Sequence, residues 1–475
     1  MEDIFNKYES ANDRINALRQ KSISVPSWDL LLKDYEPKNH AIVNDHIKLH
    51  DRELKNGNTE ESSRITLGLE KLLVNRFVDF TFALPVKRVY HNTDGDTPKA
   101  KKRKEISDAI ERIYKYARID SENIKRARAY YASCEYCTVW YTVNQENALY
   151  GFPSKFKLKC KTYSPMDGVR LYPLFDEYGD MVAMSFEYKQ KDGTDTVTFF
   201  ETYTANVHAK WKQQGGEWEE VSLDNDIVVL TNSLGKIPAV YSYRPHPVYD
   251  GLTNLRSEME YALSRNSNTI AYNAAPVLKL AGGIEGEEKK GEGYRIFRVE
   301  QGGDVSYVSW NQSTDSVKLH IDQMLKLFFM QSQMPDISAE KMMALGNIGF
   351  DARQTILMDA HLRIGEEAGA WTEALERESN VIKVFLKKLN TDYANEIDNI
   401  DIEHIITPYI QNDEKSEIQK FSSACGGKSV MSQLEAIKRL GMSSNAEETL
   451  KQIQDEEAQS QAAKMQSVFG GASAD

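Results

Sequence analysis

The sequence predicts an α+β protein, and three observations along its 475 residues support that class. Apolar residues recur at helical spacing through much of residues 1–132, then alternate with polar residues between Cys134 and Tyr243, as in half-buried strands. Helical periodicity returns at Leu252 and dominates the rest of the chain. A chain of this length can bury a large core, and we expect two to four domains.

Helices are expected before the strands. In the first twenty residues, helical spacing relates a set of apolar side chains: Ile4, Phe5, Tyr8, Ile15 and Leu18. A second helix is predicted from Ser62 to Phe82, ending before Pro85, and a third from Lys104 to Ala132. The basic run from Lys99 to Lys104 is interpreted as a solvated loop rather than a nucleic-acid patch.

An antiparallel meander is expected from Cys134 to Tyr243. Asp192-Gly193 and Gly215-Gly216 separate apolar runs and are typical of hairpin turns. Cys134 and Cys137 form a CxxC spacing, but no second Cys or His pair completes a tetrahedral zinc set. We interpret both as strand cysteines in a reducing compartment.

Two helices of similar length flank a small insert in the middle of the chain. Leu252 to Asn273 predicts a helix of roughly 33 Å, and Thr314 to Gln333 predicts its partner. Three short apolar runs between them predict strands: 277–280, 294–299 and 305–310. Each helix has only a narrow apolar stripe, so the pair alone cannot bury enough surface to be stable. The arrangement therefore predicts an oligomer in which neighbouring copies complete the packing.

The longest helix is predicted from Ala352 to Leu389, after a break at Met334-Pro335. Gly365 and Gly369 within it indicate a bend or a close backbone approach, because glycine costs about 1 kcal/mol in a helix interior relative to alanine.

A short strand from Ile402 to Ile406 and several small helices are expected to follow. Ser432 and Ser444 each precede a glutamate by three residues, which is the capping-box pattern. The tail beyond Gln459 is small and polar and is expected to be disordered.

Composition limits the possible functions. The net charge of −12 disfavours tight static binding to duplex DNA, although it is compatible with DNA as a passing substrate. No signal peptide and no 18-residue apolar run is visible, so we expect a cytosol-made product without membrane contact. Phosphate-loop, HExxH and GxSxG motifs are missing from the sequence. His46 and His50 share a helical spacing, but an exposed polar helix is favoured over a metal site, and no catalytic residue, metal or cofactor is expected.

The order of these elements resembles the portal family of long-tailed phages. Several segments carry the resemblance, among them residues 75–86 (NRFVDFTFALPV), 127–141 followed by 164–166 (SPM), 234–238 (LGKIP), 275–278 (APVL) followed by Gly282-Gly283, 334–336 (MPD) followed by 346–349 (GNIG), and 429–435 with 447–457. Phe350 and Asp351 depart from the family, which often has small residues there.

This resemblance implies an α+β portal fold with a wing, a stem, a clip and a crown. The expected parts are a wing (1–250), stem helices (251–274 and 312–333), a clip (275–311), a tunnel loop with a long, kinked wing helix (334–400) and a crown with a flexible tail (401–475). It also implies a non-enzymatic homo-oligomeric ring of about twelve copies at one capsid vertex of the virion, assembled in the host cytoplasm. Double-stranded DNA would pass through it during packaging and ejection. The expected partners are terminase, the head-tail adaptor, and the major capsid and scaffold proteins.

Three groups of residues are expected to meet DNA or partners. The DNA-facing tunnel loop would present Lys341, Met342, Met343, Leu345 and Asn347. Channel-lining cations on the stem would be Arg256, Arg265, Lys318 and Lys326. Partner docking at the clip would involve Lys279, Glu287, Arg295 and Arg298. Two alternatives stay open: a head-associated, metal-dependent DNA-processing enzyme, and a non-viral oligomeric scaffold.

Overall fold

The computed structural model confirms the α+β class. It describes residues 5, 7–53, 57, 59–93, 95–193, 195–273, 277–281, 284–285, 298–299, 304–308, 314–336, 355, 357–408, 414–426, 429–440 and 446–470. The chain divides into two compact units, the first Met1–Ile337 with Leu357–Tyr409 and the second Ser338–Ile356 with Ile410–Asp475.

The N-terminal segment is less helical than predicted. Its elements are α2 (Ala11–Leu18), α3 (Trp28–Tyr35), η1 (Pro37–Asn39), η2 (Ala41–Asn44), β1 (Arg52–Glu53), β2 (Thr59–Glu60), α4 (Leu69–Phe82) and β3 (Lys87–His91). The helix expected from Ser62 begins only at Leu69. The residues between them form neither helix nor strand.

The helix predicted from Lys104 to Ala132 is in fact two helices, α5 (Pro98–Ala117) and α6 (Ile119–Ser133). The break is at Arg118, whose left-handed backbone has a φ of 56°. The loop predicted at Lys99 to Lys104 is wrong, since these residues form the first turns of α5. Thr97 caps that helix with its hydroxyl and Pro98 occupies its first position, both common at helix starts.

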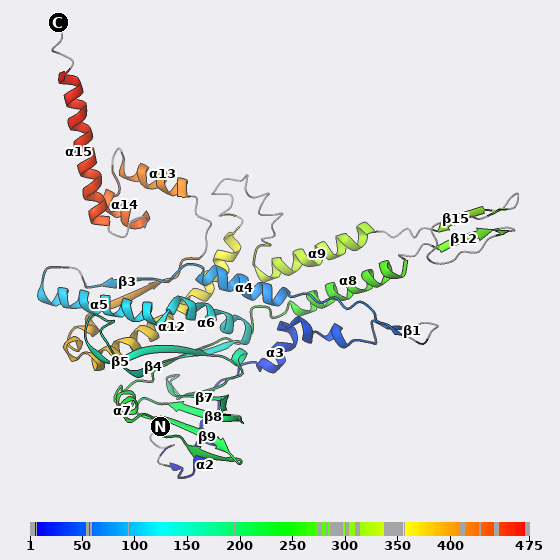
Figure 1. The fold of residues 1–475 in the computed structure, drawn as a ribbon, viewed down its shortest axis with the longest axis horizontal. Helices are drawn as coiled ribbons and strands as arrows, with labels where there is room; N and C mark the ends of the chain where they lie inside the picture. The colour runs from blue at the N-terminus through cyan, green and yellow to red at the C-terminus, as the bar shows by residue number, and fades with distance from the viewer. Residues whose placement is uncertain are drawn as a thin grey trace, which may run out of the picture. The chain divides into compact units, whose positions relative to one another are not determined.

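Two antiparallel sheets form the predicted meander (Figure 1). A three-stranded sheet has the order β11-β4-β5 and contains β4 (Glu135–Asn147), β5 (Ser154–Tyr163) and β11 (Ala239–Tyr243). A five-stranded sheet has the order β10-β9-β8-β7-β6 and contains β6 (Arg170–Phe175), β7 (Met181–Asp192), β8 (Asp195–Tyr203), β9 (His208–Gln214) and β10 (Glu217–Glu220). Both predicted hairpin turns are confirmed. Short helices η3 (Pro165–Asp167) and α7 (Asn225–Asn232) connect the strands.

The two cysteines of the CxxC spacing are free and buried. Cys137 lies in β4 as predicted, whereas Cys134 caps the end of α6 with a left-handed φ of 67°. Burial raises the pKa of the Cys134 thiol to about 12, so it stays protonated at neutral pH.

The core of the first unit packs around the long helix α12 (Met358–Leu389). The Trp371 indole lies 4.8 Å from the Phe82 ring and 5.6 Å from the Tyr136 ring, measured between centroids. No heavy atom outside the helix lies within 4 Å of a Cβ built at Gly365 or Gly369. The close backbone approach suggested for these glycines is therefore wrong.

Strand β16 (Asp401–Ile405) follows two short turns, η4 (Thr391–Tyr393) and η5 (Ile397–Asn399). It pairs antiparallel with β3, with Asp401 opposite His91. This pairing places β16 in the first unit, although the crown was expected to begin at 401.

The second unit is helical in its described part, with α13 (Glu414–Cys425), α14 (Gln433–Leu440) and α15 (Ala446–Gly470). The serine half of the capping box predicted at Ser432 is confirmed, because its hydroxyl accepts from the Glu435 N–H at 3.2 Å. Ser444 lies outside the described residues. The expected disorder beyond Gln459 is wrong as far as Gly470, since Ala, Gln, Lys and Met in this stretch favour helix.

Candidate channel-forming hairpin

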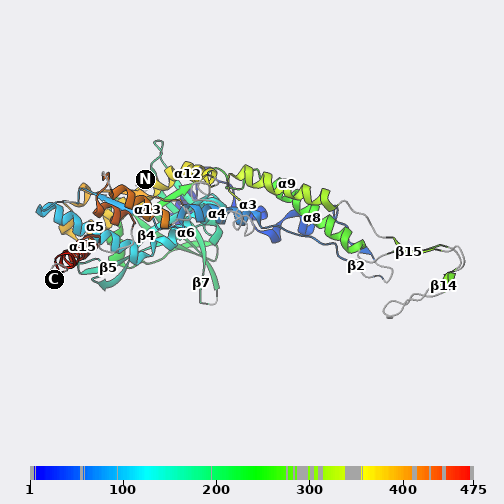
Figure 2. The ribbon, with the colours of Figure 1, turned by 90° about the horizontal axis from the view of Figure 1, so that it is seen from above.

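Two antiparallel helices project from the core of the first unit. Helix α8 (Thr253–Asn273) and helix α9 (Thr314–Ser332) lie side by side in both views (Figures 1 and 2). At 1.5 Å per residue, α8 is about 32 Å long. Both helices lie within one residue of the predicted bounds, so the predicted hairpin is confirmed.

Short strands form the tip between the two helices. β12 (Val277–Ala281) pairs with β15 (Asp304–Val308), and β13 (Ile284–Glu285) pairs with β14 (Arg298–Val299). Both pairs are antiparallel, and Val277 lies opposite Val308. The helix, β tip, helix order inferred from the sequence is therefore present.

A buried ionic network fixes the base of α8. The Arg256 guanidinium donates to three carboxylates, at 2.8 Å to Glu70, 3.0 Å to Glu260 and 2.9 Å to Asp34. The His40 ring lies between the Glu260 carboxylate, 2.6 Å from Nδ1, and the Asp34 carbonyl, 2.9 Å from Nε2. Burial opposes ionisation of Glu260, but the hydrogen bonds from His40 and the Leu67 N–H, together with the Arg256 charge, outweigh it and hold the pKa of Glu260 below its ordinary value. The stem is thus tied to α3 and α4.

Helix α9 has apolar residues on two sides. Met324, Phe328 and Phe329 are buried in the core of the first unit. An outer stripe is exposed and contains Leu319 (58% exposed), Leu327 (39%) and Met330 (61%). At 100° per residue, these three positions fall within an arc of about 80°. The outer stripe therefore has no cover within the described part of this chain.

A family profile described as "Phage portal protein, SPP1 Gp6-like" matches residues 22–463. The chain belongs to this phage portal family. Among solved structures, a chain of the "Neck of empty GTA particle computed with C6 symmetry" matches with 11% identity and a TM-score of 0.40, covering 88% of this chain and 100% of that chain. No curated protein matches.

The cations predicted to line the portal channel differ in their surroundings. Arg265, Lys318 and Lys326 are exposed on the stem helices. Arg256 is only 3% exposed and holds three carboxylates, which does not fit an exchangeable contact with DNA. Arg256 instead anchors α8 to α3 and α4, so its prediction as a channel-lining cation is wrong.

Two of the remaining predicted contact residues belong to described strands of the tip. Lys279 is in β12 and Arg298 is in β14. The other predicted contact residues lie outside the described residues. They are Glu287 and Arg295 of the expected clip, and Lys341, Met342, Met343, Leu345 and Asn347 of the expected tunnel loop.

Of the two histidines considered for metal binding, His46 lies in a turn and His50 lies outside any helix or strand, so the exposed helix that we expected is not present there. His46 Nδ1 lies 2.9 Å from the Asp51 carboxylate and 2.9 Å from the Arg64 guanidinium. The Ser62 N–H and the Arg64 guanidinium lower the pKa of Asp51 to about 2. The described residues contain no cluster of three His, Cys, Asp or Glu side chains suited to a metal.

No described helix of this portal chain combines the length and apolar character needed to cross a membrane.

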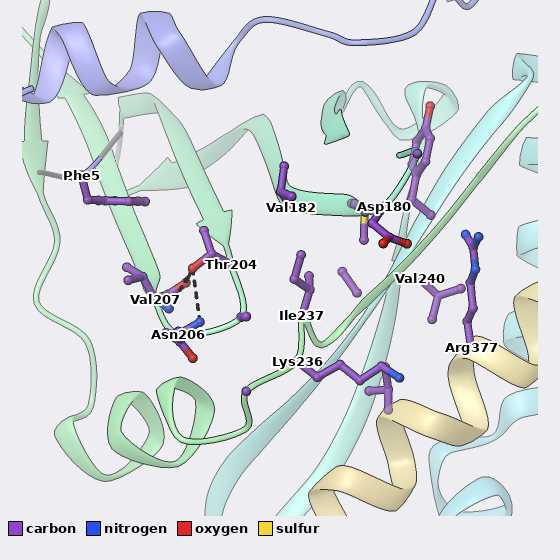
Figure 3. A pocket seen from close by; sticks show the side chains of 17 residues that line it. Phe5, Asp180, Val182, Thr204, Asn206, Val207, Lys236, Ile237, Val240 and Arg377 are labelled. Carbon is purple, nitrogen blue, oxygen red and sulfur yellow. Dashed lines mark hydrogen bonds between the residues drawn. The ribbon is translucent and has the colours of Figure 1, made fainter. Parts of the chain in front are cut away.

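An open cavity of about 970 Å³ lies between the two sheets and α12. Figure 3 shows Asp180 and Val182 on one side of it, Lys236 on another, and Arg377 approaching from α12. Partial burial and the Arg377 cation both lower the pKa of Lys236. Sequence reasoning missed this cavity, because its walls come from segments that only the tertiary fold brings together.

Proposed function

We propose that this protein forms a closed ring of about twelve copies, a portal channel at one capsid vertex of the virion through which double-stranded DNA enters and leaves. Membership of the portal family supports this proposal. The observation that carries it is the outer apolar stripe of α9, formed by Leu319, Leu327 and Met330.

A ring gives this stripe a partner. Burying an apolar side chain contributes about 1.5–3 kcal/mol, so three exposed residues on one slender helix favour association. A head-to-tail contact repeated by rotation covers every copy's stripe equally, and it closes into a ring when the rotation between copies divides a full turn. The ionic network at Arg256 would hold each stem at a constant angle to its wing, as a regular ring requires.

DNA transit would depend on weak contacts. The chain's net charge of −12 disfavours tight binding of phosphates, which lets a duplex slide. Arg265, Lys318 and Lys326 would supply exchangeable cations along the stem. The tunnel loop, at Lys341 and its neighbours, would approach DNA most closely.

The tip would dock other proteins. Its residues Lys279, Glu287, Arg295 and Arg298 would meet terminase during packaging and the head-tail adaptor afterwards. Terminase would supply the energy of ATP hydrolysis, and the portal ring itself would act without catalysis. The wing would contact the major capsid and scaffold proteins.

The mass of the assembly tests this proposal. Light scattering of the purified chain, alone and after co-expression with its capsid and scaffold proteins, should give about 650 kDa, twelve times the 54.1 kDa chain. Negative-stain images should show rings with an open centre. A monomer or dimer under both conditions would contradict the proposal.

A further inference from the structure

The two edges of the three-stranded sheet differ in chemistry. Edge strand β5 carries a lysine at every second position: Lys155, Lys157, Lys159 and Lys161. Lysines on an edge strand discourage pairing with another chain. Edge strand β11, with the sequence AVYSY, carries no charge. One edge is therefore protected against strand addition and the other is not.

The backbone of β11 has unpaired groups along its outer edge. The Trp140 N–H donates to the Pro238 carbonyl at 2.8 Å, and the Arg244 N–H donates to the Cys134 carbonyl at 2.8 Å. Antiparallel bonds recur at every second residue, so the intervening odd-numbered residues direct their N–H and C=O groups away from β4. Those residues are Ala239, Tyr241 and Tyr243. Within the described part of the chain, no further hydrogen bond reaches these backbone groups.

A groove follows this edge. The cavity of Figure 3 and a neighbouring one of about 350 Å³ share three lining residues, Gly179, Tyr241 and Arg377. Helix α12 forms one wall with small side chains, Ala370 and Ala374, and the β6–β7 turn forms the other. The groove therefore leaves space for an extended segment beside β11.

The charge of the groove selects the occupant. Lys236 forms no ion pair among the described residues, whereas Arg377 pairs with Glu373 on its own helix. An unpaired cation beside open backbone groups fits an extended segment with acidic side chains.

The same chain carries an edge strand with this chemistry. β10 is the outer strand of the five-stranded sheet, and its Glu217, Glu219 and Glu220 side chains are exposed. The Val221 N–H donates to the Lys210 carbonyl at 2.8 Å, so Trp218 and Glu220 direct their backbone groups outward by the same alternation. β10 thus offers backbone groups and carboxylates together.

β10 cannot fill the groove of its own copy. It lies four strands away from β6, a distance of about 19 Å, and the β6–β7 turn borders the groove. A contact between different patches on two copies of one chain is heterologous, and repetition of such a contact closes into a ring when the rotation between copies divides a full turn.

We propose that β10 of one copy adds to β11 of the next copy as an extra strand, with its glutamates beside Lys236 and Arg377. The contact joins the two sheets across each wing interface. This inference rests on the proposed ring, and it names the wing surfaces that hold neighbouring copies together.

Charge reversal tests the pairing. Lys236→Glu with Arg377→Glu, and separately Glu217→Lys with Glu219→Lys, should each raise the concentration for half-assembly at least tenfold in light scattering. The chain with all four changes should recover to within about threefold of the unaltered protein, because opposite charges face each other again. Lys159→Glu with Lys161→Glu, on the protected edge, is the matched control and should assemble normally.

Several outcomes would overturn the inference. The inference is wrong if the two charge-reversed variants assemble normally, or if the chain with all four changes does not recover. It is also wrong if the control variant loses assembly to the same extent. Failure of the unaltered chain to form rings would count against the proposed function as well, which separates the two proposals.

Zero-length carbodiimide crosslinking of unaltered rings gives a second readout. Rings mixed from isotopically light and heavy copies should yield inter-copy crosslinks from Lys236 to Glu217, Glu219 or Glu220. Rings that yield other inter-copy crosslinks but none of these would also contradict the pairing.

Discussion

At the residue scale, the network around Arg256 depends on one shared proton. The Asp34 carbonyl can only accept, so His40 Nε2 donates to it. The Leu67 N–H already donates to Glu260 Oε1 at 2.7 Å, and a proton must also lie between this oxygen and His40 Nδ1. Arg256 then balances the remaining negative charge of Glu70 and Glu260, both fully buried.

Removing the Arg256 cation should destabilise the folded protein. We expect Arg256→Met to lower the free energy of unfolding by about 3–5 kcal/mol, because two buried carboxylates lose their charge partner. Denaturant unfolding measures the change. The exposed Arg265→Met is the matched control and should cost less than about 0.5 kcal/mol. Equal losses in both variants would show that the network does not stabilise the fold.

His404 should make stability depend on pH. Burial, with the Arg88 cation nearby, lowers the pKa of His404 to about 4, against about 6.5 in an unfolded chain. The neutral ring is favoured in the folded state, so its contribution is complete above about pH 6.5 and is lost as the pH falls toward 4. The loss approaches about 3 kcal/mol. Unfolding of the protein and of His404→Phe between pH 4 and 7 should show a smaller slope in the variant, and identical slopes would contradict the assignment.

The sequence could not predict the role of Arg256. Its position on a polar-sided helix indicated an exposed cation, but two of its partners, Glu70 and Asp34, lie 186 and 222 residues away in the chain. Contacts at such separation leave no local pattern. The capping role of Ser432 was predictable, because its partner Glu435 lies within the same turn.

At the element scale, the stem helices were predicted well and the α5–α6 break was not. The stem has a clear helical period on both sides of an insert rich in glycine. Arg118 interrupts a strong helical pattern without a Gly or Pro, the residues that usually mark a break. The pairing of β16 with β3 joins residues 401–405 to residues 87–91, and no local periodicity indicates it.

The Arg118 backbone gives an element-scale prediction. A left-handed conformation costs about 1–2 kcal/mol for a residue with a Cβ, and Arg118 is exposed, so Arg118→Gly should raise the free energy of unfolding by about 1 kcal/mol. Lys104→Gly, at an exposed position inside α5, should instead lower it by about 1 kcal/mol. Thermal unfolding of both variants checks the opposite signs, and a loss of stability in both would contradict the proposed strain.

The outer stripe of α9 gives a second prediction at the element scale. Leu327→Glu with Met330→Glu should raise the concentration for half-assembly by about a hundredfold or more, because charged side chains would have to enter an apolar contact. Val229→Glu, at an exposed apolar position in α7, should have little effect. Sedimentation velocity over a concentration series measures both, and similar behaviour of the two variants would exclude the stripe from the contact.

At the scale of the whole molecule, the order of parts was predictable because each part has its own pattern. Along the chain, the spacing of apolar residues is helical, then alternating, and then helical again, and glycines mark the tip. The predicted start of the C-terminal part at residue 401 was less accurate, because β16 (residues 401–405) pairs with β3 and belongs to the first unit. The groove beside β11 required the fold itself, because segments far apart in the chain form it.

In the proposed ring, the outer stripe of α9 packs against a neighbouring copy and the axis of the ring stays open. Electron cryomicroscopy of the assembled particle, at a resolution that places side chains on α9, tests it most directly. We expect a neighbouring copy to cover Leu319, Leu327 and Met330, around a central opening wide enough for a duplex. Particles in which the stripe faces solvent, or whose centre is closed, would contradict it.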